Sequence, residues 1–191
     1  YIVDGNIIKE CENKLRKHIL NTKEIKLRGT HNFENICAAL AATRELVDEK
    51  TAVEAIKEFN SVEHRLEFVR EINGVKWYND SASSSPSRTI AGLNAYDEEI
   101  VLIAGGYDKN LDYDILGKYI VKKVKALLLI GNTAKKILDA TTKEMEKQGV
   151  ELPICFCQTL EDAVKAAKQV AKENQVVLFS PASASFDMFK N

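Results

Sequence analysis

Residues 79–86 group six side chains that can form hydrogen bonds: one amide, one carboxylate and four hydroxyls. A largely apolar run, residues 75–78, precedes them, and residues 89–93 have the composition of a helix. The group is therefore expected where a strand passes into a helix. Backbone N–H groups and the helix dipole favour negative charge at such a point. We predict an anion-binding loop over residues 79–86.

Three later loops follow other expected strands: residues 105–109, 131–133 and 180–185. None has the phosphate-binding pattern G-x-x-x-x-G-K-[ST] or G-x-G-x-x-G. Gly105-Gly106 would let the backbone approach a ligand, and Lys109 would offer a point charge to a carboxylate or phosphate. The last loop leads into Phe186-Asp187-Met188-Phe189, so its hydroxyls and the first helical N–H groups suit a second carboxylate. Turn structure alone also explains each of these loops.

The elements that must position these loops alternate between strand and helix from about residue 64. Asn73-Gly74 predicts a hairpin with a type I′ turn. The strands after it are apolar throughout, which is typical of a parallel sheet buried on both faces. We predict an α/β fold, a Rossmann-like, doubly wound, mostly parallel sheet in which ligands bind beyond the carboxyl ends of the strands. The expected strands are 66–72, 75–78, 100–104, 126–130, 154–157 and 176–179, and the expected helices are about 113–121, 133–147, 161–173 and one starting at Ser185.

The first part of the chain follows a different pattern, and we expect two domains, 1–62 and 63–191. Asp4-Gly5-Asn6 predicts a hairpin turn within residues 2–8, and mixed polar sequence then runs to Leu27. Apolar residues at helical spacing predict a helix within 31–49. Thr51 and Glu54 fit a capping box for a short helix that ends near Phe59.

Two polar pairs lie outside the four loops. Asn32 and Asn35 follow His31 near the start of the first helix, where N-capping explains one asparagine and a planar partner such as adenine suits the other. His64-Arg65 lies at the expected domain boundary, where ligands often bind. The simpler alternative pairs Arg65 with a surface carboxylate.

Composition excludes several classes of function. The 191 residues have a formal net charge of −1 and 45% hydrophobic residues, which is typical of a globular protein and not of a nucleic-acid surface. The longest purely apolar run, residues 126–130, is too short to span a bilayer, and no signal peptide pattern opens the sequence. We expect a cytoplasmic protein with no membrane or nucleic-acid partner. Cys155 and Cys157 fit small buried thiols better than zinc ligands or a disulfide.

Five ordered motifs resemble the Mur ligase family over nearly the whole chain. They are Gly29-x-His31-Asn32-x-x-Asn35-x-x-Ala38-Ala39, His64-Arg65-x-Glu67, Asn79-Asp80-Ser81, Gly105-Gly106-x-Asp108-Lys109 and Ser180-Pro181-Ala182-x-Ala184-Ser185-Phe186-Asp187-x-Phe189. The Asn79-Asp80-Ser81 motif and the motif that begins at Ser180 are most similar to the member that adds D-glutamate to UDP-N-acetylmuramoyl-L-alanine in peptidoglycan synthesis.

The resemblance implies a three-domain enzyme with an N-terminal UDP-sugar domain, a central ATPase domain and a C-terminal Rossmann-like domain that brings the amino acid. ATP, with Mg²⁺, would phosphorylate the carboxylate of UDP-N-acetylmuramoyl-L-alanine, and the amine of D-glutamate would displace phosphate. The resemblance assigns ATP contacts to Asn32 and Asn35 (adenine), Arg65 (phosphates) and Asp80 (ribose). It assigns D-glutamate contacts to Ser84 and Lys109 (α-carboxylate) and to Ser185 (side-chain carboxylate).

The sequence also departs from the family pattern. Ala82 stands where the family commonly has a lysine, and Arg88 is the candidate for a replacement cation. The 191 residues contain no P-loop, and the sequence stops soon after Phe189. We therefore expect a fragment, the tail of the central ATP-binding domain plus most of the C-terminal domain. It would have no complete catalytic set and no ligase or ATPase activity by itself.

Two other functions remain open at this point. One is a Mur-type or folylpolyglutamate-type ligase that adds a different amino acid. Measuring which amino acids raise the melting temperature of the protein would distinguish this alternative. The other is a non-enzymatic amino-acid or nucleotide binding module, which a P-loop upstream of Tyr1 would exclude.

Overall fold

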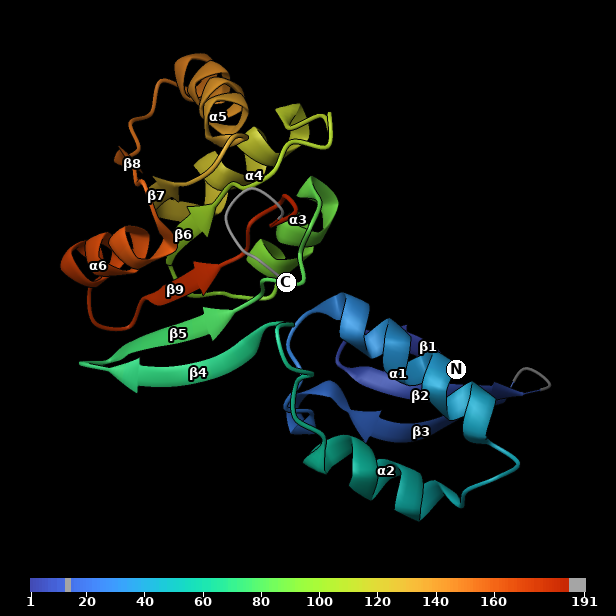
Figure 1. Cartoon of the computed structure of the whole chain (residues 1–191). Helices are drawn as coiled ribbons and strands as arrows, with labels where there is room; N and C mark the ends of the chain where they lie inside the picture. The colour runs from blue at the N-terminus through green and yellow to red at the C-terminus, as the bar shows by residue number, and fades with distance from the viewer. Residues whose placement is uncertain (13–14, 186–191) are drawn as a thin grey trace. The chain divides into compact units, whose positions relative to one another are not determined.

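The computed structural model describes residues 1–185 except 13 and 14. The chain divides into two compact units, Tyr1–Ser61 and Val62–Asn191 (Figure 1). The predicted helix from Ser185, with Phe186-Asp187-Met188-Phe189, lies outside the described residues.

The first unit is a three-stranded antiparallel sheet with two α-helices and one 3₁₀ turn. Strand order is β1-β2-β3, and buried aliphatic side chains, among them Ile8, Leu20, Ile36 and Leu40, form its core. The described elements are β1 (Ile2–Asp4), β2 (Ile7–Glu12), β3 (Leu15–Asn21), η1 (Thr22–Glu24), α1 (Thr30–Thr43) and α2 (Glu49–Glu58). The predicted hairpin turn at residues 4–6 is confirmed by the pairing of β1 with β2.

Two local predictions in this unit are wrong, and the first helix is shorter than the apolar pattern that predicted it. Strand β3 occupies sequence that we assigned no structure, because only Leu20 along it is buried and the apolar alternation is too weak to see. The first helix ends at Thr43, short of Leu46, whose side chain is exposed. Helix α2 is capped by Asp48 and not by Thr51, because the Asp48 carboxylate accepts a hydrogen bond from Thr51 N at 3.0 Å.

The second unit is a six-stranded, mostly parallel sheet flanked by helices, which confirms the predicted fold class. Strand order is β4-β5-β9-β6-β7-β8; β4 is antiparallel to β5 and the other neighbours are parallel. Its elements are β4 (Glu67–Ile72), β5 (Val75–Asn79), α3 (Pro86–Asn94), β6 (Ile100–Ala104), α4 (Asp114–Lys123), β7 (Val124–Leu129), α5 (Ala134–Gln148), β8 (Ile154–Phe156), α6 (Leu160–Val170) and β9 (Val176–Phe179). The β4–β5 turn has positive φ at both Asn73 (52°) and Gly74 (73°), as a type I′ turn requires.

Side chains alternate between the two faces of this sheet. In β6, Leu102 packs into the cluster formed with α3, α4 and α5, while Val101 and Ile103 pack into the cluster formed with α6 (Figure 1). Because helices cover both faces, every residue of β6 is buried. This double burial explains the uninterrupted apolar run in the sequence.

The position of β9 decides which loops meet. Although β9 is the last strand among the described residues, it pairs with β5 on one side and with β6 on the other. Parallel strands end at the same edge of a sheet, so the loops after β5, β6, β7 and β9 all lie at one edge. Residues 79–86 and 180–185, about 100 positions apart, thereby become neighbours.

Candidate functional site

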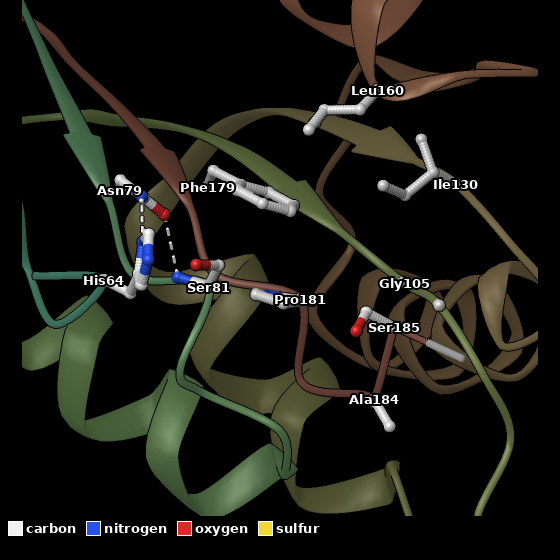
Figure 2. A pocket seen from close by; sticks show the side chains of 11 residues that line it. His64, Asn79, Ser81, Gly105, Ile130, Leu160, Phe179, Pro181, Ala184 and Ser185 are labelled. Atoms are coloured by element: carbon white, nitrogen blue, oxygen red, sulfur yellow. Dashed lines mark hydrogen bonds between the residues drawn. The ribbon is translucent and has the colours of Figure 1, made fainter. Parts of the chain in front are cut away.

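A cavity of about 460 Å³ lies at this edge of the second unit. Figure 2 shows His64, Asn79 and Ser81 on one side of it and Ile130 with Leu160 on the other. The remaining lining residues come from the ends of β6 and β9 and from the loops after them: Gly105, Gly106, Phe179, Pro181, Ala184 and Ser185. The cavity thus combines polar groups with an apolar wall, as small-molecule sites commonly do.

Of the predicted site residues, Ser185 lines this cavity. The other predicted residues of the second unit, Arg65, Asp80, Ser84 and Lys109, are not among the described residues that line it. Lys109 is exposed, and Ser84 is half-buried. Lys109 and Ser84 nevertheless lie in loops at the same sheet edge as the cavity.

His64 and Asn79 form a hydrogen-bonded polar pair in the lining of the cavity. Ser81 N donates to Asn79 Oδ1 at 3.0 Å, which orients the amide so that Nδ2 faces His64 Nδ1 at 2.9 Å (Figure 2). Nδ1 must therefore accept, so the neutral imidazole carries its proton on Nε2. Asn79 Nδ2 also lies 3.3 Å from Glu67 Oε2.

The backbone around Arg65 is in an uncommon conformation. His64 and Leu66 both have positive φ, 66° and 46°, which is costly for residues other than glycine. Such strain persists where the surrounding structure imposes it, often at functional sites. The Arg65 side chain is exposed, and among the described residues no carboxylate forms an ion pair with it, contrary to the simpler alternative.

Asp80 is the buried centre of the loop after β5. Its residue is 4% exposed, and its Oδ1 accepts from Leu66 N at 3.2 Å. Its Oδ2 accepts from Ser83 Oγ at 2.6 Å and from Ser180 Oγ at 2.7 Å. The carboxylate therefore ties the turn before β4 to the loops after β5 and β9.

The backbone packed against residues 105 and 106 leaves no room for a Cβ, which explains why both are glycine. A Cβ on Gly105 would lie 1.9 Å from Ile130 O, and one on Gly106 would lie 2.3 Å from Ala184 O. The loop after β6 passes between the loops after β7 and β9, where Gly105 N donates to Pro181 O at 2.8 Å. Glycine is required here for close backbone approach, and the same two residues line the cavity.

Two further cations lie near these loops. Arg88 Nη1 is 3.4 Å from Ala82 O, which puts a guanidinium beside the position where we noted a missing lysine. Lys136 Nζ contacts Asp108 at 2.6 Å, and this bond, with the Asn110 N–H as a smaller cause, lowers the pKa of Asp108. Lys109 therefore follows a carboxylate that stays ionised.

The two asparagines of the first unit contact each other. Asn32 Nδ2 donates to Arg28 O at 2.6 Å, and Asn35 Nδ2 lies 3.4 Å from Asn32 Oδ1. Neither caps the helix, because the N-cap of α1 is Gly29. The N-capping explanation for one asparagine is therefore wrong.

The four cysteines are free thiols; Cys155 is exposed rather than buried as predicted, and Cys11 is also exposed. Burial raises the pKa of the Cys157 thiol to about 11, with the neighbouring Cys155 as a smaller cause. Over the described ranges, no group of three or more His, Cys, Asp or Glu side chains could hold a metal ion.

Some residues at this edge have no signal in the sequence. Tyr113 at the start of α4 and Ser183 after β9 are 3% and 2% exposed, yet their hydroxyls lie 2.8 Å apart. A tyrosine at a helix start and a serine in a turn are each unremarkable in sequence, and only the topology joins them.

Comparison with known proteins relates the chain to one family. A family model described as Mur ligase, glutamate ligase domain, matches residues 64–183. The UDP-N-acetylmuramoylalanine–D-glutamate ligase of Acetivibrio thermocellus is 50% identical over 182 residues, 94% of this chain and 39% of that protein. The protein of the same name from Clostridium tetani is 46% identical over 175 residues, 92% of this chain and 38% of that protein. The chain thus spans about two fifths of the length of these relatives.

Solved structures show the same fold at low sequence identity. MurF from Acinetobacter baumannii superposes with a TM-score of 0.64 at 18% identity, covering 92% of this chain and 41% of that chain. Folylpolyglutamate synthase from Thermotoga maritima gives a TM-score of 0.56 at 17% identity, with coverage of 92% and 41%. The family model spans more than half of the chain and confirms the resemblance drawn from the five motifs: the chain belongs to the Mur ligase family.

Proposed function

We propose that this chain is the part of a UDP-N-acetylmuramoylalanine–D-glutamate ligase that holds the incoming D-glutamate and contributes to ATP binding. The observation that carries the proposal is the 46–50% identity, over more than nine tenths of the chain, to relatives of that name. Because the chain spans about two fifths of those relatives, the activity is proposed for the longer protein. In this proposal residues 1–62 end the central ATP-binding domain and residues 63–191 belong to the C-terminal domain.

The amino-acid subsite in this proposal consists of Lys109, Ser84 and Ser185. At neutral pH D-glutamate has two carboxylates and one ammonium group. A cation and hydroxyl donors suit the two carboxylates. The three residues lie in the loops after β6, β5 and β9, which the strand order puts at one sheet edge. Arg88, beside the Ala82 backbone, is the second cation available to the same subsite.

The proposal also assigns ATP contacts within each unit: Asn32 and Asn35 in the first, and Arg65 in the second. The exposed guanidinium of Arg65 suits a phosphate. Asp80 is the fourth residue that the resemblance assigns to ATP. The burial of its carboxylate and its three protein donors support a role in holding the loops together.

The reaction proposed for the longer protein proceeds in two steps. A carboxylate oxygen of UDP-N-acetylmuramoyl-L-alanine attacks the γ-phosphorus of ATP, which gives an acyl phosphate and ADP. The D-glutamate amine then attacks the acyl carbon, and the tetrahedral intermediate expels phosphate, a far better leaving group than hydroxide. This chain would orient the amine by fixing both carboxylates of the amino acid. We assign Mg²⁺, which the family uses with ATP, to none of the described residues, because they contain no suitable cluster.

The test uses the full-length protein from which this chain comes. We expect phosphate release that requires ATP, UDP-N-acetylmuramoyl-L-alanine and D-glutamate together. L-Glutamate, L-lysine and meso-diaminopimelate serve as matched controls, and a folate substrate with L-glutamate tests the folylpolyglutamate-type alternative. Turnover with one of the other amino acids but not with D-glutamate would replace the proposed substrate, and no turnover with any of them would favour a binding module.

A further inference from the structure

Three hydroxyl side chains form a continuous buried chain beneath the loops after β6, β7 and β9. Tyr113 Oη lies 2.8 Å from Ser183 Oγ, which in turn lies 2.8 Å from Thr133 Oγ1. Tyr113 precedes α4 and Thr133 precedes α5. All three residues are at most 3% exposed. These three hydroxyls therefore lie inside the protein, out of reach of a bound ligand.

Both ends of this hydroxyl chain meet backbone groups of the strand-end loops. Thr133 Oγ1 lies 3.1 Å from Gly106 O and accepts from Gly106 N at 3.0 Å. At the other end, Tyr113 Oη lies 3.3 Å from Ala182 O. The hydroxyls can donate in either direction. In one, Tyr113 donates to Ser183, Ser183 to Thr133, and Thr133 to Gly106 O. In the other, Thr133 donates to Ser183, Ser183 to Tyr113, and Tyr113 to Ala182 O. Every proton has an acceptor in either direction, so the network is fully satisfied.

These contacts fix the loops on which the proposed amino-acid subsite depends. Gly106 lies in the loop that contains Lys109, and Ser183 lies two residues before Ser185. A backbone bond from Tyr107 N to Ala184 O, at 2.8 Å, joins the same two loops. Thr133 thus holds both loops from the start of α5.

Packing alone does not require these hydroxyls. Valine at 133 or phenylalanine at 113 would fill nearly the same volume without the cost of burying a hydroxyl. What such a replacement removes is the acceptor for Gly106 N and the link to Ser183. A satisfied buried network specifies one arrangement of the segments that it joins.

We propose that Thr133, Ser183 and Tyr113 are positioning residues for the bound dicarboxylic amino acid. They act through the backbone of Gly106 and Ala182, and they set the separation between Lys109 and Ser185 to match the two carboxylates. This inference rests on the proposed function. It adds three residues that touch neither substrate to those that determine amino-acid affinity.

The experiment compares KM values in the full-length protein. Thr133→Val raises KM for D-glutamate about tenfold and changes KM for ATP less than twofold, because Arg65 and its turn are outside the hydroxyl chain. Thr133→Ser keeps the hydroxyl and restores the low KM. Thr141→Val is the matched control, because Thr141 is fully buried on α5, the helix that follows Thr133, and its Oγ1 donates within that helix to Ile137 O at 2.7 Å.

Ser183→Ala and Tyr113→Phe should likewise raise KM for D-glutamate and leave KM for ATP nearly unchanged. They replace Thr133→Val in the test if that variant does not fold. An equal change in both KM values, no change, or the same split in Thr141→Val overturns the inference while the proposed function stands. A wild-type protein that uses another amino acid, or none, overturns the proposed function and this inference with it.

Discussion

At the scale of single residues, burial separates the groups that hold the site from those that can meet a ligand. Asp80 and Thr133 have the polar groups expected of ligand contacts, yet they are 4% and 0% exposed and bond to neighbouring loops. Lys109, Arg65 and Ser185 are exposed at the same edge. The exposed set therefore contains the better candidates for contact with phosphate and carboxylate groups.

Asp80→Asn should destabilise the 191-residue chain by about 1–3 kcal/mol, because a charged acceptor of three buried hydrogen bonds becomes a neutral amide. Urea unfolding followed by circular dichroism measures this loss in the second unit. Asp97→Asn is the control, since Asp97 is exposed in the same unit. Equal stability of both variants would show that the Asp80 carboxylate does not hold the loops.

The thiols of Cys155 and Cys157 should react at very different rates. With a pKa of about 11, Cys157 is thiolate in about one molecule in a thousand at pH 8, whereas Cys155 is exposed. Ellman's reagent should therefore label Cys157→Ser rapidly at position 155 and Cys155→Ser slowly at position 157. Comparable rates in the two variants would contradict the burial of Cys157.

At the scale of elements, apolar runs and turn residues predict most of the second unit. The runs at 100–104 and 176–179 predict β6 and β9 because both are buried on two faces, and Asn73-Gly74 predicts the β4–β5 hairpin. Strand β3 is not predictable in this way, since four of its seven residues are exposed and only Leu20 is buried. Nor does local sequence reveal the bond between Asp80 and Ser180, because it joins residues 100 positions apart.

The candidate site was predictable as a set of loops but not as a set of contacts. Strand ends in a parallel sheet identify the loops with Ser84, Lys109 and Ser185 from sequence alone. The insertion of β9 between β5 and β6 is a property of the topology, and it decides which loops touch. It also explains why the fold needs Gly106, where a Cβ would meet Ala184 O after β9, while Gly105 is needed because of Ile130 O after β7.

Gly105→Ala should destabilise the second unit by clearly more than Gly149→Ala. Both glycines have positive φ, 114° and 65°, so both substitutions cost conformational strain, about 1 kcal/mol for the left-handed helical region. Only at Gly105 would the new Cβ also meet backbone, 1.9 Å from Ile130 O, while nothing lies within 4 Å at Gly149. Thermal unfolding of the two variants checks the order, and equal losses would contradict the close crossing of the loops.

At the scale of the whole molecule, the chain is two compact units, and its Acetivibrio thermocellus relative is about two and a half times as long. No helix in the part of the chain that the structure describes is long and apolar enough to cross a membrane. In our proposal each unit has its own ATP-contacting residues, Asn32 and Asn35 in the first and Arg65 in the second. The amino acid is bound by the second unit alone.

The most direct test of amino-acid binding by the second unit is the effect of Lys109→Ala on the KM values of the full-length protein for D-glutamate and ATP. We predict that KM for D-glutamate rises at least about tenfold, as expected for loss of a charged hydrogen bond worth about 1.5–3 kcal/mol, while KM for ATP changes less than twofold. Lys136→Ala, which removes a neighbouring lysine paired with Asp108, should leave both values nearly unchanged. Equal increases in KM for D-glutamate and ATP after Lys109→Ala would contradict the proposal that the strand-end loops of the second unit hold the amino acid.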